Sequence, residues 1–193
     1  WLSDRRYGVG CDQVLLIDSA DESDVTLSVY NADGSTAGTC GNGVRCIAAL
    51  LMAETGQSSI SIAADHGTIV RAVALKSGLI AVDMGIPKTK WWEIPLAHEM
   101  DTQCLDLASQ AGPGVTLKGP AAVSMGNPHV IFFVPDVDAV PLESVGSSLE
   151  KNPIFPEGAN ISVVSIENRQ ILHVKVWERG CGLTLACGSA ACA

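Results

Sequence analysis

Short segments in which apolar and polar residues alternate make up most of the chain. The alternation is clear in Ile171-Leu-His-Val-Lys-Val176, and most other segments are rich in Val, Ile and Thr. A period of two residues and β-branched side chains are typical of β-strands. Gly67, Ser77-Gly78 and Asn168 lie between neighbouring segments, where hairpin turns are expected. The pattern predicts strands over residues 25–31, 59–64, 68–75, 79–84, 121–125, 130–134, 161–166 and 171–176.

One segment has a helical period instead. Apolar residues recur from Val44 to Leu51 at spacings of three and four residues, and Cys46 and Leu50 fill the opposite side. A helix that is apolar nearly all round is buried on all sides, and Gly56 is suited to a left-handed cap at its end. Weaker amphipathic patterns predict helices over residues 101–111 and 142–150.

These elements predict an α+β fold with two lobes, each a mainly antiparallel β-barrel or roll around a central helix. The composition changes at Met84-Gly-Ile-Pro-Lys-Thr-Lys-Trp-Trp92, where strands give way to Pro and charge. We therefore place the boundary within residues 86–92 and expect one lobe over residues 1–88 and another over residues 89–193.

A short motif occurs once in each lobe. Cys40-Gly41-Asn42-Gly43 begins the predicted buried helix, and Cys187-Gly188-Ser189-Ala190 lies near the end of the chain. In both, Cys-Gly is followed by a small polar residue and a small residue, with another cysteine five or six positions after the first. Two copies, one in each lobe, indicate an internal duplication.

Cysteine followed by glycine at the start of a helix is a favourable place for a reactive thiol. Unpaired N–H groups and the positive end of the helix dipole stabilise a thiolate and can bind a substrate carboxylate. Two such sulfurs on opposite sides of one carbon would let one remove a proton while the other delivers a proton to the opposite face. The paired motifs therefore predict inversion of a stereocentre.

Composition narrows the function classes. Acidic residues outnumber basic ones 21 to 12, and the net charge of −9 argues against a nucleic-acid or anionic-membrane surface. The longest apolar run, Cys46–Ala53, is too short to span a bilayer. Seven cysteines without a CxxC pair, and four scattered histidines, predict neither a disulfide framework nor a metal site. They favour a reducing compartment, the cytoplasm.

Further motifs run in order through almost the whole chain. They are Arg5-Arg6-Tyr7-Gly8-Val9-Gly10-Cys11-Asp12-Gln13, Tyr30-Asn31-Ala32-Asp33-Gly34-Ser35, Met125-Gly126-Asn127-Pro128-His129, Gly158-Ala159-Asn160 and Trp177-Glu178-Arg179-Gly180. With the two Cys-Gly motifs, this series resembles the diaminopimelate epimerase family, cofactor-independent isomerases of lysine and peptidoglycan-precursor synthesis.

The resemblance implies an enzyme that interconverts LL- and meso-diaminopimelate without a cofactor, so that its binding partner is a small amino-acid substrate. Cys40 and Cys187 would be the two acid/base groups, one thiolate and one thiol, and His129 and Glu178 would tune their acidity. A homodimer is also expected from the resemblance. The implied substrate-binding residues are Gln13, Asn31, Gly41, Asn42, Asn127, Asn160, Glu178, Arg179, Gly188 and Ser189.

The chain departs from the family pattern in several places. The strands that usually come first, with a Gly-Asn-Asp segment, are absent, and the chain stops at Ala193, where the second central helix begins. Leu183 stands where an acidic residue is common, and Cys181 replaces a small residue. A barrel that lacks strands exposes edges and core, so we expect residues 1–193 alone to be unstable or prone to aggregation.

The residues leave alternatives open. Proline and hydroxyproline racemases use the same two-cysteine fold, but they favour His after the first Cys-Gly, where this chain has Asn42. A catalytically silent ligand-binding relative is a second alternative, which retention of both cysteines disfavours. A thiol-redox protein is a third, disfavoured because the two cysteines lie in separate lobes without a CxxC pair.

Overall fold

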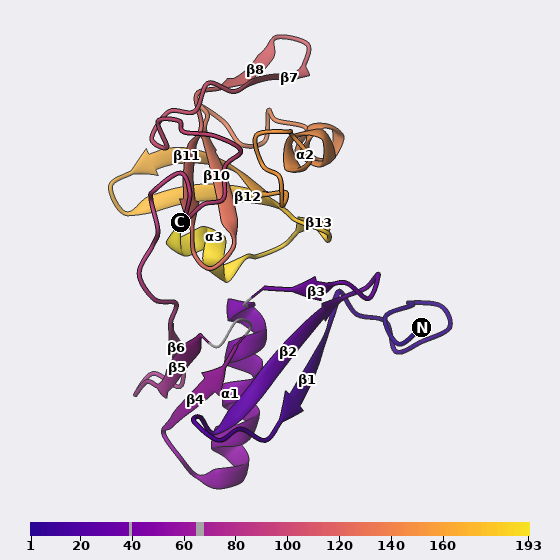
Figure 1. Cartoon of the computed structure of the whole chain (residues 1–193), viewed down its shortest axis with the longest axis vertical. Helices are drawn as coiled ribbons and strands as arrows, with labels where there is room; N and C mark the ends of the chain where they lie inside the picture. Colours follow the sequence, from indigo (N-terminus) through magenta and orange to yellow (C-terminus); the bar gives the residue numbers. More distant parts are fainter. Residues whose placement is uncertain (39, 65–67) are drawn as a thin grey trace. The chain divides into compact units, whose positions relative to one another are not determined.

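The structure, a computed structural model, describes residues 1–38, 40–64 and 68–193 of the chain. These residues form two compact units, Trp1–Gly85 and Ile86–Ala193; the sequence predicts the division between residues 88 and 89. Both units combine β-sheet with helix (Figure 1), which confirms the predicted α+β class.

The first unit contains a mixed sheet with helix α1 (Gly41–Thr55) against it (Figure 1). Its strands are β1 (Gln13–Asp18), β2 (Val25–Asn31), β3 (Thr36–Ala37), β4 (Ser59–Ala63), β5 (Ile69–Ala74) and β6 (Ile80–Asp83). The order is β1-β2-β4-β5-β6, with β3 paired to β2. Only β2 and β4 run parallel among these described pairs, because α1 forms the crossover between them.

The core of the first unit lies between α1 and the sheet. Val44, Ile47 and Ala48 of the helix are buried with Leu27 of β2 and Ile60 of β4, among others. The helix ends at Gly56, which is left-handed at φ 73° and donates its N–H to the carbonyl of Met52, as predicted.

The prediction that this helix is buried on all sides is wrong. Cys46 and Leu50 are exposed, and Leu50 is 48% accessible. The sheet covers only the face that carries Val44 and Ala48, and no described element of the unit covers the opposite face. The apolar residues on the opposite face therefore do not pack against another described element of this unit.

The second unit contains a sheet with the order β13-β12-β11-β10-β9, in which β10 and β11 are parallel. The strands are β9 (Ala121–Ser124), β10 (Pro128–Phe133), β11 (Asn160–Asn168), β12 (Ile171–Glu178) and β13 (Gly182–Thr184). A separate hairpin and two helices complete the unit: β7 (Ala108–Gly112), β8 (Val115–Lys118), α2 (Leu142–Glu150) and α3 (Gly188–Cys192).

Helix α2 covers one face of this sheet (Figure 1) and closes the main core of the unit. Val130 and Phe132 of β10 and Ile161 and Val163 of β11 point into that core. Because successive residues of a strand alternate between faces, His129 and Ile131 lie on the other face of the sheet. This second face carries the candidate site residues described below.

The predicted strands are all present, with their ends shifted by at most two residues, and Gly78 is left-handed (φ 81°) in the β5–β6 turn. The turn expected at Gly67 lies outside the described residues. The pattern missed β1, β3, β7, β8 and β13.

The helix predicted over residues 101–111 is wrong. Most backbone partners of this segment lie in residues 115–122: Leu105 N donates to the Pro120 carbonyl at 2.8 Å, Ala122 N donates to the Thr102 carbonyl at 2.7 Å, and residues from Ala108 onward pair with β8. Leu105 and Leu107 are both buried, a period of two that the helical pattern obscured. Long-range pairing thus overrides the local preference for a helix.

Among the described residues, no helix is both long enough and apolar enough to cross a membrane.

Candidate active site

Cys40 is the N-cap residue of α1. Its backbone is extended (φ −97°, ψ 102°), and its Sγ accepts a hydrogen bond from the Gly43 N–H at 3.3 Å. A Cβ atom on Gly43 would come within 3.0 Å of the Leu15 side chain, so glycine allows β1 to pack against the start of the helix. The N–H donor and the positive end of this 15-residue helix both favour the negatively charged sulfur.

Gln13 and Asn31 lie opposite each other on β1 and β2. Gln13 Nε2 donates to Asn31 Oδ1 at 3.1 Å, and Asn31 Nδ2 donates to Ser35 Oγ at 3.1 Å. Ser35 Oγ donates in turn to Asp33 Oδ1 at 2.6 Å. The family motif singled out Gln13 and Asn31 but not Ser35 and Asp33 as their partners. The sequence does contain a signal for these partners, because short polar residues follow Asn31 in a turn with glycine, and such side chains often form local hydrogen bonds.

The first turn of α1 holds the other predicted residues of this unit. Gly41 is buried and Asn42 is half-buried. The Asn42 Oδ1 accepts a hydrogen bond from the guanidinium of Arg45, one turn further along the helix. Arg45 was not predicted as a site residue, and it orients the Asn42 carboxamide.

In the second unit, His129 of β10 is paired with Asn160 of β11 in the parallel register. Both are almost inaccessible, with exposures of 0% and 2%. Asn160 uses both ends of its carboxamide: Nδ2 donates to the Pro128 carbonyl at 2.9 Å, and Oδ1 accepts from the Arg179 N–H at 2.9 Å. It therefore ties the residue before His129 to the turn that follows β12.

His129 contacts two of the predicted binding residues. Its Nε2 is 2.9 Å from Asn127 Oδ1 and 3.0 Å from Ser189 Oγ. The Nδ1 atom is buried and has no hydrogen-bond partner among the described residues. Burial, with a smaller contribution from the positive charge of Arg179, lowers the pKa of His129 to about 4. The imidazole is therefore neutral at physiological pH.

Cys187 is the N-cap residue of α3, and its Sγ is 3.4 Å from Ser189 Oγ. Burial raises the pKa of the Cys187 thiol, and the nearby Glu178 carboxylate adds to this effect against the hydrogen bonds from Ser189 and Ala190. Glu178 is itself fixed by Thr184, whose Oγ1 donates to Glu178 Oε1 at 2.6 Å. The expectation that a helix start would make this thiol more acidic is wrong for Cys187, because burial outweighs the local donors.

Arg179 points its guanidinium toward the chain that precedes Asn160. Its Nη1 donates to the carbonyl of Glu157 at 2.8 Å, and a Cβ atom on Gly158 would come within 3.2 Å of the Arg179 side chain. Gly158 is left-handed (φ 70°), a conformation that also favours glycine. The Gly158-Ala159-Asn160 motif thus packs against Arg179 and fixes its position.

The predicted site residues fall into two groups, one in each unit. Each group contains one cysteine at the start of a helix and at least one carboxamide held by hydrogen bonds. No group of three or more His, Cys, Asp or Glu residues able to hold a metal ion occurs within the described ranges. The first group is Gln13, Asn31, Cys40, Gly41 and Asn42; the second is Asn127, His129, Asn160, Glu178, Arg179, Cys187, Gly188 and Ser189.

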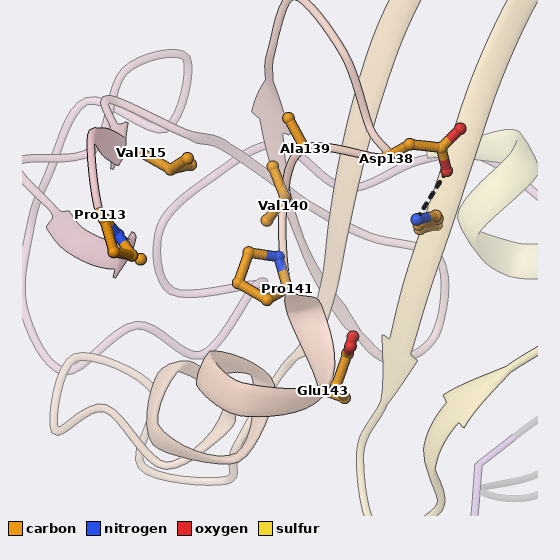
Figure 2. A pocket seen from close by; sticks show the side chains of 9 residues that line it. Pro113, Val115, Asp138, Ala139, Val140, Pro141 and Glu143 are labelled. Carbon is orange, nitrogen blue, oxygen red and sulfur yellow. Dashed lines mark ion pairs between the residues drawn. The ribbon is translucent and has the colours of Figure 1, made fainter.

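A pocket of about 310 Å³ lies elsewhere in the second unit (Figure 2). The β7–β8 hairpin contributes Pro113 and Val115 to its lining, and the start of α2 contributes Glu143. Lys175 Nζ pairs with Asp138 Oδ1 at 2.8 Å on one side of it. None of the predicted site residues lines this pocket.

The fold is shared with solved structures of amino-acid racemases and related proteins. A hydroxyproline epimerase from Agrobacterium vitis matches with a TM-score of 0.64 at 12% identity, over 94% of this chain and 58% of that one. A PhzF-family phenazine biosynthesis protein from Bacillus anthracis matches with a TM-score of 0.59 at 17% identity, over 95% and 64% of the two chains. The chain therefore spans less than two thirds of these proteins, and the likeness defines a fold class: the two-lobed α+β epimerase and racemase fold.

Sequence comparison identifies the family within this class. The family model for diaminopimelate epimerase matches residues 1–90 and 121–193. The diaminopimelate epimerases of Pelagibacter ubique and Acidiphilium cryptum are 43% and 47% identical over the whole chain, which covers 69% and 67% of their lengths. The chain belongs to the diaminopimelate epimerase family, isomerases that epimerise diaminopimelate in lysine biosynthesis. This favours the main prediction over a proline or hydroxyproline racemase.

Proposed function

We propose that Cys40 and Cys187 epimerise diaminopimelate as a pair of acid/base groups, without a cofactor. The observation that carries the proposal is the contrast between their environments. Cys40 has a helix N-terminus and an N–H donor, which favour the thiolate. Cys187 is buried beside Glu178, which raises its pKa and favours the thiol. A two-base inversion needs one group of each kind in the resting protein.

The proposed reaction moves one proton off the α-carbon and another onto it. The Cys40 thiolate takes the α-proton and becomes a thiol, and the C–H electron pair stays on the substrate as a carbanion. The Cys187 thiol then delivers its proton to the opposite face and becomes a thiolate. The opposite substrate configuration uses the two cysteines in exchanged roles, so the atoms and charges balance in both directions.

The carbanion needs fixed donors, because an amino-acid α-proton is only weakly acidic and no electron sink is provided. We assign this role to the backbone N–H groups at Gly41, Asn42, Gly188 and Ser189. The side chains of Gln13, Asn31, Asn127, Asn160, Glu178 and Arg179 would hold the polar ends of the substrate. The support is that these side chains are already oriented by hydrogen bonds to the protein.

The proposed setting is a bacterial cytoplasm, with a small amino acid as the substrate and no nucleic-acid or membrane partner. Cys46, Cys104 and Cys192 are free and exposed thiols, which suits a reducing compartment. The net charge of −9 disfavours a polyanionic partner. In the full-length protein we also propose a homodimer, on the basis of the family resemblance.

The test is epimerisation of LL-diaminopimelate in D₂O by the full-length protein and its Cys40→Ser and Cys187→Ser variants. The meso product should carry solvent deuterium at the inverted carbon, because the donating thiol exchanges with water. Either substitution should lower turnover at least about 100-fold. Cys104→Ser, at an exposed thiol, is the matched control and should not. Undiminished turnover in either active-site variant, or faster turnover of proline than of diaminopimelate, would refute the proposal.

A further inference from the structure

The Ser189 hydroxyl lies between His129 and Cys187 and contacts both of them. Its Oγ is 3.0 Å from His129 Nε2 and 3.4 Å from Cys187 Sγ, and it is 3% exposed. A serine hydroxyl has one hydrogen to donate. Which neighbour receives that hydrogen decides whether Ser189 supports the histidine or the sulfur.

The imidazole settles the direction of the first bond. A neutral histidine carries a hydrogen on only one ring nitrogen. Nε2 faces Asn127 Oδ1, which can only accept, whereas Nδ1 has no partner within the described part of the chain. A hydrogen on Nδ1 would be a buried donor without an acceptor, which is costly. The hydrogen therefore sits on Nε2, and this nitrogen cannot accept from Ser189.

With Nε2–H as the donor, the Ser189 oxygen faces His129 as an acceptor and its own hydrogen is left for Cys187. We propose that His129 orients the Ser189 hydroxyl so that its O–H donates to the Cys187 sulfur and stabilises the thiolate formed after proton transfer. This inference rests on the proposed function, because it concerns the same reacting sulfur. His129 is then a positioning residue, which acts on Cys187 only through Ser189.

Opposing contacts on its sulfur allow Cys187 to serve in both protonation states. The carboxylate of Glu178, fixed by Thr184, lies against Cys187 and favours the thiol. The Ser189 O–H favours the thiolate. Burial, with a smaller contribution from the positive charge of Arg179, keeps His129 neutral. The two opposing contacts keep the thiol and the thiolate of Cys187 similar in free energy. A group that acts alternately as acid and base requires this.

The experiment measures the rate at which iodoacetamide alkylates Cys187 as a function of pH, read by mass spectrometry of the peptide that contains it. In Ser189→Ala the midpoint of the curve should move to higher pH, and alkylation at pH 7 should slow by about three- to tenfold. The range allows for the loss of one hydrogen bond to a charged sulfur and for the higher reactivity of a more basic thiolate. Ser189→Thr keeps the hydroxyl and should restore the rate to within about twofold.

A second pair of variants tests the role of His129. His129→Leu removes the donor and should slow alkylation when Ser189 is present. When Ser189 is already alanine, the same change should have less than about a twofold further effect. Ser165→Ala, at another buried serine of the sheet, is the matched control, and exposed Cys104 in the same digest is the internal reference.

Two results would overturn the inference: a Ser189→Ala curve that coincides with that of the unchanged protein, or an equal effect of His129→Leu with and without Ser189. The readout does not depend on turnover. A failure of the proposed function, shown by an active Cys187→Ser variant, would leave the alkylation curves interpretable, so the two failures can be told apart.

Discussion

The carboxylate of Glu150, the last residue of α2, accepts a hydrogen bond from the indole Nε1 of Trp177 at 2.7 Å. Its other oxygen accepts from the Gly180 N–H at 3.2 Å, and the residue is only 9% exposed. One buried carboxylate thus holds both ends of the turn that carries Glu178 and Arg179. The fold supports the candidate site from a helix that contributes no residue to it.

Replacing Glu150 by alanine should destabilise the second unit by about 2–4 kcal/mol. The change leaves the Trp177 and Gly180 N–H groups without their acceptor, and an unpaired buried donor costs about 1–3 kcal/mol. Urea unfolding followed by tryptophan fluorescence measures the effect. Glu99→Ala removes an exposed carboxylate and should change the free energy of unfolding by less than about 0.5 kcal/mol. Equal midpoints for the two variants would mean that Glu150 does not anchor the turn.

Gly146 in α2 should not tolerate a methyl group, although alanine is normally the better helix former. A Cβ atom there would come within 2.3 Å of the Trp177 ring. We expect Gly146→Ala to lower stability by about 2 kcal/mol or more through overpacking. Ser147→Ala, at the next and exposed position, should be neutral or slightly stabilising. Thermal unfolding of the two variants gives the comparison; a stabilised Gly146→Ala protein would contradict the contact.

Asn31→Asp should destabilise the first unit, although the two side chains have the same shape. The substitution replaces the Nδ2 donor to Ser35 by an oxygen and adds a negative charge near Asp33, in a site that is 6% exposed. A loss of about 1–3 kcal/mol is expected at neutral pH, and less in acid, where the new carboxyl is protonated. Asn168→Asp, in the exposed β11–β12 hairpin, is the control. A pH-independent effect would show that charge is not the cause.

The regular elements follow from the sequence where local pattern and tertiary packing agree. The strand at Val25–Asn31 and the helix at Leu142–Glu150 are predicted residue for residue, because one face of each is buried and the other is polar or exposed. The segment over residues 101–111 fails for the converse reason. Its apolar spacing fits a helix, but most of its backbone partners lie in residues 115–122, and no local pattern contains that information.

The candidate site shows the same limit at the level of single residues. Motifs found Cys187, His129 and Ser189, but the contact between His129 and Ser189 joins residues 60 positions apart. The anchoring role of Glu150 carries no motif at all, since a glutamate at the end of an amphipathic helix is most often solvated. The Cys-Gly dipeptide does not predict the raised pKa of Cys187 either, because burial depends on how the whole chain packs.

The buried neutral His129 should make the second unit acid-sensitive. Folding lowers its pKa from an ordinary value of 6.5 to about 4, so the unfolded chain binds the proton more readily than the folded one. The stability that depends on the neutral ring is complete above about pH 6.5 and is lost as the pH falls toward 4. Over this window the loss is about 3 kcal/mol.

Urea unfolding at pH 7.0, 5.5 and 4.5 measures this loss directly. Among the carboxyls, Asp4, Asp24, Asp33 and Asp138 have pKa values held below 3.8 by their hydrogen bonds, so they titrate in stronger acid. His129→Leu should therefore flatten the slope between pH 6.5 and 4.5. His173→Gln, at an exposed histidine paired with Glu167, should keep it. If His129→Leu unfolds with the same pH dependence as the unchanged protein, folding does not lower the pKa of His129, and the imidazole titrates in the folded protein as it does in the unfolded chain.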